Sequence, residues 1–421
     1  MKLEFGFGTS TQTVEVPEKN YMGELLPNAM EHKLMGEDAV KAALEAPIGT
    51  QRLGDVIRAG KSAGRGNKVA IIASDVSRPS PSYAIIPSIL DELYAAGVAR
   101  EDITVVFAVG SHRKQTDEER KKLVGERVYS EVRCVDSDPA DCVSFGTTTA
   151  GTPVDITRAV AEADFRICTG NIEFHYFAGF SGGVKALIPG CATRNTIQSN
   201  HSMMVRDDAH AGKLDGNPLR EDLEEAGRMV GIDFIVNVVL DEHKKIVHAV
   251  AGDPVKAHRS GCEYLSRMYL KKIPHRADIV LVSQGGAPKD LNLYQTQKAL
   301  DNAKHAVKDG GVIILIGSCK EGLGEGVFEK WIHEAQTSHD LIDRIKTHFE
   351  LGGHKAAAIA MVLEHADVYL VSEMDTELVR KCFLKPYTDA QSALNDALAK
   401  CGEDATILAM PYGGSTLPQV M

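Results

Sequence analysis

One histidine, one lysine and four glycines occur within the stretch HYFAGFSGGVKALIPG, His175 to Gly190. Val184 precedes Lys185 and Ala186 follows it, so this is not a Walker A loop, which needs glycine before the lysine and a hydroxyl after it. The glycines could still let backbone N–H groups approach an anion. A lysine among small and apolar residues can also be a nucleophile or a covalent anchor. The remaining alternative is an ordinary surface lysine in a flexible loop.

Three of the fifteen histidines stand out by their positions. His112 follows the apolar run DITVVFAVG, His175 opens the glycine stretch, and His201 follows RNTIQSN. Each alone is more often structural. Two of them could flank a substrate as alternating acid and base, because an imidazole titrates near neutral pH. The third could bind a metal, but a single imidazole does not hold one tightly, so most ligands would come from elsewhere, such as an organic cofactor.

Two further motifs carry charged groups. DVSRP places Asp75 and Arg78 after the apolar run KVAIIAS. Arg78 could form a bidentate contact with a carboxylate or phosphate, and Asp75 could orient a histidine; the alternative is a local ion pair that shapes the turn. YQTQK places Tyr294, Gln295 and Lys298 near a helix start. Tyr294 and Lys298 are four residues apart and so share one face of that helix. That face suits an anionic hydroxylated ligand, unless it is ordinary solvated helix surface.

The elements around these motifs alternate between short apolar runs and helical segments. Thr116 and Glu119 have the spacing of a capping box at a helix start, and FIVNVVLDEHKKIVHAVAG is typical of a β-hairpin. This alternation predicts an α/β fold, with buried parallel strands and crossover helices. A second series of strands begins near Leu270–Asp278, which predicts two α/β domains with mostly parallel sheets flanked by helices. Four strands are followed at once by Gly, Ser, His, Arg or Lys. Since ligands bind beyond the carboxyl ends of strands in open α/β sheets, we expect one active site in the cleft between the domains.

The composition narrows the class of protein. An apolar fraction of 43% with 25% charged residues is typical of a globular chain. The formal charge of -11 argues against a nucleic-acid partner, and no apolar run approaches the length of a membrane helix. The start of the chain lacks the form of a signal peptide. Eight scattered cysteines without a CxxC pair suit free thiols, so we expect a cytoplasmic protein.

The motifs occur here in one order: DVSRP, GSH, the glycine stretch, Asn200–His201, LDGNP and YQTQK. Together they resemble the lactate racemase family, the nickel-pincer enzymes. The resemblance runs over nearly the whole chain, from about Lys2 to the closing PYGGSTLP, and the glycine stretch from His175 to Lys185 is its most specific element. It implies an isomerase that racemises a small 2-hydroxy acid by proton-coupled hydride transfer.

The resemblance also implies a role for each candidate residue. Nickel would be held in pyridinium-3,5-bisthiocarboxylic acid mononucleotide, joined covalently to Lys185, with His201 as the ligand from the protein. His112 and His175 would be the acid/base pair. The cofactor would also be contacted by Asp75, Arg78, Gly182 and Gly183, and the substrate by Arg78, Tyr294, Gln295 and Lys298. Partner proteins that synthesise the cofactor would have to supply it.

The substrate and the domain boundaries are less closely defined. Lactate is the first expectation, but small residues at 356–358 could enlarge the pocket for malate, 2-hydroxybutyrate, an aromatic hydroxy acid or a sugar acid. His354 and Lys355 beside them could add a polar contact, but a helix-surface pair is the stronger expectation. The first domain should hold residues 1–272 and the second 273–404, with residues 405–421 returning to the first, as the resemblance implies.

Two other kinds of protein compete with a racemase. The first is a nucleotide- or phosphate-binding protein without turnover, which would bind its ligand but leave the configuration of a 2-hydroxy acid unchanged. The second is a dehydrogenase that uses free nicotinamide dinucleotide. It is disfavoured because no GxGxxG motif opens a helix in a βαβ unit.

Overall fold

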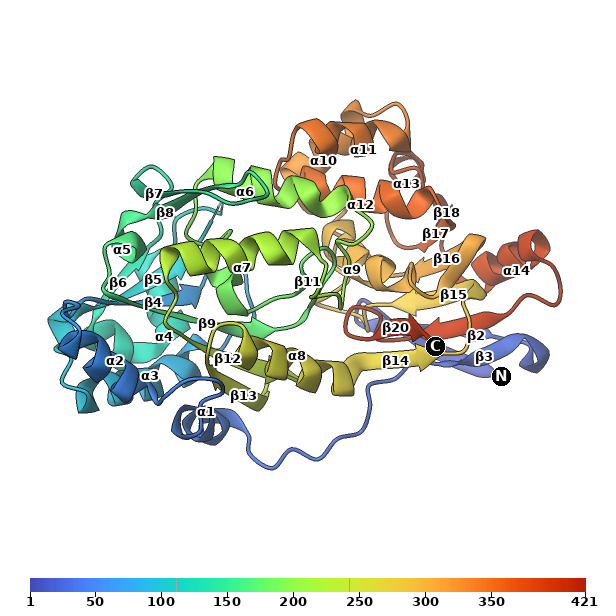
Figure 1. Ribbon diagram of the computed structural model, residues 1–421. Helices are drawn as coiled ribbons and strands as arrows, with labels where there is room; N and C mark the ends of the chain where they lie inside the picture. Colours follow the sequence, from blue (N-terminus) through green and yellow to red (C-terminus); the bar gives the residue numbers. More distant parts are fainter. Residues whose placement is uncertain (111, 242) are drawn as a thin grey trace. The chain divides into compact units, whose positions relative to one another are not determined.

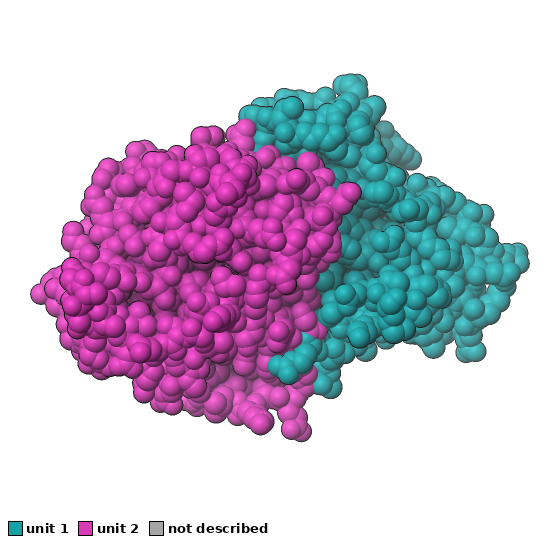
Figure 2. Space-filling view, viewed as in Figure 1, with its two compact units in different colours: residues 1–29, 267–421 teal, residues 30–266 magenta. Residues whose placement is uncertain are grey.

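The structure, a computed structural model, describes residues 1–110, 112–241 and 243–421. The chain forms two compact units, unit 1 from residues 1–29 and 267–421 and unit 2 from residues 30–266 (Figures 1 and 2). Each unit is built on a six-stranded sheet that carries helices. The predicted α/β class with mostly parallel strands is confirmed.

The sheet of unit 2 has the strand order β13-β12-β9-β4-β5-β6. All neighbours are parallel except β12 and β13, which form the hairpin predicted for this part of the sequence. The strands are β4 (Val69–Ser74), β5 (Ile103–Ala108), β6 (Arg133–Asp136), β9 (Phe165–Ile172), β12 (Phe234–Leu240) and β13 (Ile246–Gly252). β4, β9 and β12 are almost entirely buried, as expected of central strands.

Helices and short strands complete unit 2. The capping box predicted at Thr116 and Glu119 is present at the start of α4. Asn217 caps α7 and Pro218 occupies its first turn. The helices are α1 (Gly36–Glu45), α2 (Leu53–Ser62), α3 (Ser82–Ala95), α4 (Asp117–Glu131), α5 (Arg158–Ala161), α6 (Arg194–His201), α7 (Pro218–Val230) and α8 (Lys256–Tyr269), the last crossing the boundary between the units. The shorter elements are β7 (Cys142–Thr147), β8 (Pro153–Thr157), β10 (Phe174–His175), β11 (Gly179–Phe180) and the 3-10 turns η2 (Arg100–Asp102), η3 (Gly183–Ala186) and η4 (Ser202–Val205).

The sheet of unit 1 is entirely parallel, in the order β18-β17-β16-β15-β19-β3. Its strands are β3 (Tyr21–Glu24), β15 (Ala277–Ser283), β16 (Val307–Ile316), β17 (Asp367–Val371), β18 (Lys385–Tyr387) and β19 (Ile407–Met410). The other elements are β1 (Lys2–Phe7), β2 (Ser10–Glu15), η1 (Glu18–Asn20), α9 (Leu293–Ala303), α10 (Gly326–Glu334), α11 (Ser338–Thr347), α12 (Gly353–Leu363), α13 (Thr376–Lys381), α14 (Ala390–Cys401) and the parallel pair β14 (Leu270–Ile273) and β20 (Leu417–Val420).

The boundaries of the units differ from the expected domains at both ends of the chain. Residues 1–29 were expected in the first domain but lie in unit 1, because β3 pairs in parallel with β19 and the N–H of Leu25 donates to the carbonyl of Ala409 at 2.8 Å. The β1–β2 hairpin buries Phe5 in the same core as Ile279 of β15. Residues 405–421 were expected to return to the first domain. They stay in unit 1, since β19 lies beside β15 and β20 pairs with β14.

The parallel arrangement of unit 2 brings the candidate residues together. The carboxyl ends of β9, β4 and β5 lie at one edge of the sheet, and the loops that follow them carry DVSRP, His112 and the glycine stretch. Among the described residues, no helix has both the length and the apolar character needed to cross a membrane.

Candidate functional site

Asp75 and His112 form a hydrogen-bonded pair beyond the carboxyl ends of two neighbouring strands, β4 and β5. Oδ2 of Asp75 lies 2.5 Å from Nδ1 of His112, and Oγ of Ser77 donates to Oδ1 of Asp75 at 2.8 Å. Burial raises the pKa of Asp75, but the contacts with His112 and Ser77 and the charge of Arg78 outweigh it, and the pKa lies below its usual value. An ionised Asp75 keeps the proton of a neutral His112 on Nδ1, which leaves Nε2 as the basic nitrogen.

His175 is the last residue of the short strand β10, and its two ring nitrogens have the opposite roles to those of His112. The backbone N–H of Ala178 donates to Nδ1 of His175 at 3.3 Å, so the neutral ring carries its proton on Nε2. Burial lowers the pKa of His175 well below its usual value. Nearby positive charge acts in the same direction, and it comes from Lys185, His201, Arg78 and Arg220. Nε2 of neutral His112 can therefore accept a proton, whereas neutral His175 presents an N–H at Nε2, which acts as an acid only when the ring is protonated.

Lys185 lies in η3, within the glycine stretch. Its side chain is partly buried, and its amine has no hydrogen-bond or ion-pair partner among the described residues. Burial, and then the positive charges of Arg78 and Arg220, lower the pKa of Lys185 well below its usual value. Such a lysine readily gives up its proton and becomes a nucleophile. This environment suits a covalent anchor better than the surface lysine that was its alternative.

The glycines before Lys185 pack tightly against the protein itself. The N–H of Gly183 donates to Oδ1 of Asn237 on β12 at 2.7 Å, so it is not available to an anion in this arrangement. A Cβ atom at Gly182 would lie 2.9 Å from the same oxygen, and one at Gly183 would lie 3.0 Å from the ring of His258. Close packing thus accounts for both glycines, and their contact with a cofactor stays a prediction.

His201 is the last residue of α6 and is 4% exposed. Its Nδ1 lies 3.0 Å from Oδ1 of Asn200, whose Nδ2 donates to Asp222 at 2.7 Å. The amide nitrogen is thereby committed, so Oδ1 is the acceptor and the proton of the imidazole sits on Nδ1. Nε2 of His201 is then the nitrogen that can coordinate a metal. The ring of Phe177 contacts both imidazoles, with centroids 4.5 Å from His175 and 5.0 Å from His201.

Among residues 1–110, 112–241 and 243–421, no three His, Cys, Asp or Glu side chains form a group that could hold a metal ion. His201 would therefore enter a metal site as one protein ligand, which is the number that the resemblance implies.

Sequence reasoning missed Arg220, a buried cation in α7. Its Nε donates to the carbonyl of Ala178 at 3.2 Å and one Nη donates to that of Phe180, while its Nη1 is buried without a partner in the described structure. Arg220 thereby holds the turn that carries His175. The nearest signal was the motif LDGNP, whose Asn217 accepts the N–H of Arg220 at 3.2 Å. Nothing in an amphipathic helix pattern distinguishes a buried arginine from an exposed one.

In unit 1, the residues of YQTQK lie at the start of α9, which is capped by Asn292. Tyr294 and Gln295 are partly buried, whereas Lys298 is exposed. Nζ of Lys355 donates to the carbonyl of Tyr294 at 2.6 Å and lies 4.2 Å from the centroid of its ring. Lys355 therefore fixes the first turn of α9, where the proposed substrate contacts begin.

The expectation of a helix-surface pair at His354 and Lys355 is wrong. They are 6% and 5% exposed, because the first turn of α12 packs against the interior of unit 1. A Cβ atom at Gly353 would overlap the ring of Trp331, which is itself fully buried. The small residues at 356–358 are also buried, where they let α12 pack closely inside unit 1. They give no evidence of an enlarged pocket.

Unit 2 thus brings eight of the candidate residues together, and unit 1 carries the other three. Those of unit 2 are Asp75, Arg78, His112, His175, Gly182, Gly183, Lys185 and His201. That both sets line one cleft stays a prediction. Ser111 of the GSH motif lies outside the described residues.

Two family models match most of this chain. The model of the lactate racemase N-terminal domain matches residues 7–212, and that of the lactate racemase C-terminal domain matches residues 272–417. A lactate racemase from Thermoanaerobacterium thermosaccharolyticum is 34% identical over 99% of this chain and 98% of its own length. One from Lactiplantibacillus plantarum is 32% identical over 98% of each.

Solved structures show the same likeness. The lactate racemase apoprotein from Thermoanaerobacterium thermosaccharolyticum superposes with a TM-score of 0.90 at 34% identity, over the whole of both chains. A protein from Thermotoga maritima shares the fold, with a TM-score of 0.65 at 21% identity over 93% of this chain and all of its own. The identity to named relatives over nearly the full length confirms the resemblance seen in the motifs. This chain belongs to the lactate racemase family.

Proposed function

We propose that this chain is an isomerase that interconverts the enantiomers of a small 2-hydroxy acid, with lactate as the first candidate. One observation carries the proposal. Unit 2 holds a histidine whose basic nitrogen is Nε2, His112, and another whose Nε2 bears the proton, His175. An enzyme that converts one enantiomer into the other needs a base that removes the hydroxyl proton of the first. It also needs an acid that returns a proton to the oxygen as the second enantiomer forms. The relatives of known name are lactate racemases.

The α C–H of a 2-hydroxy acid is weakly acidic, so direct removal of a proton from carbon is difficult. A nickel-pincer cofactor, when bound, supplies reversible hydride acceptance at that carbon. The protein's task is then to move the hydroxyl proton. Nε2 of His112 takes it from one enantiomer, with Asp75 stabilising the imidazolium that forms. His175, in its imidazolium form, would give its Nε2 proton to the oxygen of the opposite enantiomer and be left neutral, and the roles exchange in the reverse direction.

The residues of unit 2 fit such a cofactor. Lys185 would be its covalent anchor, since burial and nearby cations favour the neutral amine. His201 would be the nickel ligand, because Asn200 fixes the tautomer that leaves Nε2 for the metal. Asp75, Arg78, Gly182 and Gly183 would complete the cofactor contacts. Partner proteins would make and deliver the cofactor, in the cytoplasm.

The substrate would be held by its carboxylate and hydroxyl. Arg78 is exposed, with a guanidinium suited to a carboxylate. Tyr294, Gln295 and Lys298 of unit 1 would provide the remaining contacts.

Chirality is the decisive measurement. Cofactor-loaded protein should convert either pure enantiomer of lactate into a racemic mixture, and chiral chromatography measures this conversion. The rates for malate, 2-hydroxybutyrate, an aromatic hydroxy acid and a sugar acid should be lower than the rate for lactate. His112→Ala and His175→Ala should each lower the rate about 100-fold or more. His333→Ala, at an exposed histidine of α10, is the matched control. A loaded protein that binds these acids without inverting any of them would instead be a nucleotide-binding protein.

A further inference from the structure

The loops that carry Asp75 and His112 are joined by a third side chain, that of Gln115. Gln115 lies three residues after His112 and is 5% exposed. Its Oε1 accepts the backbone N–H of Val76, the residue after Asp75, at 2.8 Å. A single amide therefore connects the loop after β5 to the loop after β4, one residue away from the carboxylate that holds the imidazole.

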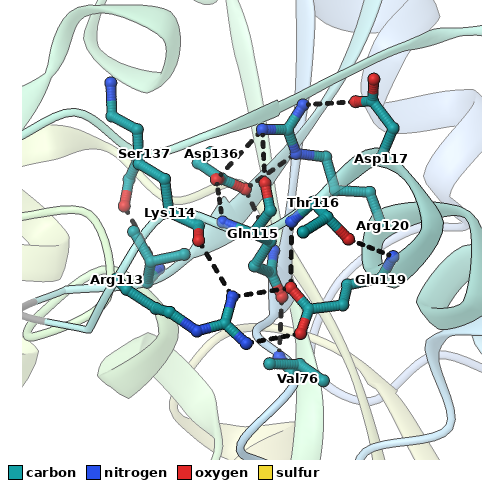
Figure 3. A network of polar contacts seen from close by, with 11 residues as sticks. Val76, Arg113, Lys114, Gln115, Thr116, Asp117, Glu119, Arg120, Asp136 and Ser137 are labelled. Atoms are coloured by element: carbon teal, nitrogen blue, oxygen red, sulfur yellow. Dashed lines mark hydrogen bonds and ion pairs between the residues drawn. The ribbon is translucent and has the colours of Figure 1, made fainter.

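The other end of Gln115 is anchored to Asp136, at the end of β6. Nε2 of Gln115 donates to Oδ1 of Asp136 at 3.0 Å, and the backbone N–H of Gln115 donates to Oδ2 at 2.7 Å (Figure 3). These partners settle the orientation of the amide, since a carboxylate accepts and the N–H of Val76 donates. Asp136 is in turn held by Nε of Arg120 at 3.2 Å. The loops after β4, β5 and β6 thus share one network of polar contacts.

We propose that Gln115 is a positioning residue of the acid/base pair, which keeps Asp75 within hydrogen-bond distance of His112. This inference rests on the proposed function, in which His112 is one of the two acid/base groups. Gln115 would touch neither substrate nor cofactor. It acts because an acid/base group must be held within a fraction of an ångström of its productive geometry, and a loop bound at one end alone is not held so closely.

Small displacements of the backbone are enough to break the contact between Asp75 and His112. The Asp75–His112 contact is 2.5 Å long, so a shift of about 1 Å in either loop would break it, and misplacements of that size cost roughly 100-fold in rate. Without the amide, the N–H of Val76 would lose its acceptor. Arg113, the charged neighbour of His112, is already held by Glu119 at 2.5 and 2.8 Å.

Two substitutions test the role. Gln115→Glu keeps an acceptor for Val76 but sets a second carboxylate against Asp136, and Gln115→Met removes both contacts at similar size. We expect each to lower kcat roughly 10- to 100-fold with a smaller change in KM. The exchange Gln115→Glu with Asp136→Asn restores one amide and one carboxylate but sets an amide N–H group where Oδ1 of Asp136 accepts Nε of Arg120, so it should recover part of the lost kcat. Gln391→Met is the matched control, because Oε1 of Gln391 accepts the N–H of Glu15 at 2.7 Å in unit 1.

A second readout does not depend on turnover. In apoprotein labelled with ¹⁵N-histidine, the Nδ1 proton of His112, assigned by its loss in His112→Asn, should exchange faster with water in both single variants and more slowly again in the exchanged pair. Unchanged kcat and an unchanged His112 resonance would overturn the inference. So would a loss of kcat with the resonance intact, since it would mark a merely structural role. The proposed function fails separately, if His112→Ala itself turns over normally.

Discussion

Nδ1 of His201 lies 3.0 Å from Oδ1 of Asn200, the residue before it, and the amide that accepts this proton is itself bound to Asp222. Partners of this kind fix the tautomer and the orientation of a metal-binding imidazole. Asn200→Ala should therefore lower nickel affinity about 10- to 100-fold while the protein stays folded. Nickel retained after dialysis of the holoprotein, measured by mass spectrometry, gives the test. Asn395→Ala, at an exposed asparagine of α14, should retain nickel normally. Equal retention in both variants would contradict the role of Asn200.

Lys185 should determine whether the cofactor stays attached. Lys185→Ala should show no adduct by intact-protein mass spectrometry after loading, because no other residue supplies the amine. Lys185→Arg should behave in the same way although it keeps the positive charge, since a guanidinium is not a nucleophile at neutral pH. Lys121→Ala, which removes a surface ion pair with Glu126, should load normally. An adduct of the same mass on Lys185→Ala would rule out the anchor.

His258 makes the stability of unit 2 depend on pH. It is 1% exposed and donates through Nε2 to the carbonyl of Ser181 at 2.8 Å, beneath the glycine stretch. Burial, and then the charge of Arg220, lower the pKa of His258 to about 3. An unfolded imidazole takes up its proton near pH 6.5, so the unfolded state binds more protons below that pH. This contribution to stability is complete above pH 6.5 and is lost as the pH falls toward 3.

The loss should amount to about 1.4 kcal/mol per pH unit within that window. Urea unfolding at pH 7, 6 and 5 gives the free energy of unfolding at each pH. The slope of this free energy against pH should be smaller in His258→Gln than in the unmodified protein. The exposed His333 provides the control variant His333→Gln, whose slope should match that of the unmodified protein. Identical slopes in all three proteins would show that His258 is accessible to protons.

Gly179 in the turn between β10 and β11 should resist substitution. Its φ is +75°, and a Cβ atom there would overlap the carbonyl of Lys213. Gly179→Ala should lower the free energy of unfolding by roughly 3 kcal/mol or more, through overlap added to backbone strain. Gly151→Ala is the matched comparison, since its φ is +88° with open space around it, and it should cost about 1 kcal/mol. Equal losses by thermal denaturation would mean that the turn moves to accept the side chain.

Much of the site could be predicted because its residues sit where parallel strands end. The runs before Asp75, His112 and the glycine stretch read as buried strands, and such strands place the loops that follow them at one edge of a sheet. Adjacency in space then follows from adjacency in the sheet. The local pattern also predicted the capping box of α4 and the β12–β13 hairpin, since both depend on residues close together in the sequence.

What escaped prediction depends on contacts between distant segments. The pairing of β3 with β19 joins residues nearly 400 positions apart, and four residues of an edge strand carry too little pattern to reveal a partner. Arg220 and Lys355 are polar residues on helices, where the default expectation is exposure, and only the tertiary packing shows that both are buried. The same holds for Gln115, whose two side-chain partners lie in the loop after β4 and at the end of β6.

The discontinuity of unit 1 has a consequence for synthesis of the chain. A ribosome makes the edge strand β3 early, but its neighbour β19 emerges only after the whole of unit 2 and most of unit 1 have been translated. Residues 30–266 can collapse as a block in the meantime, while β3 still lacks the strand that it pairs with. A nascent protein stalled before residue 407 would thus display the open edge of β3.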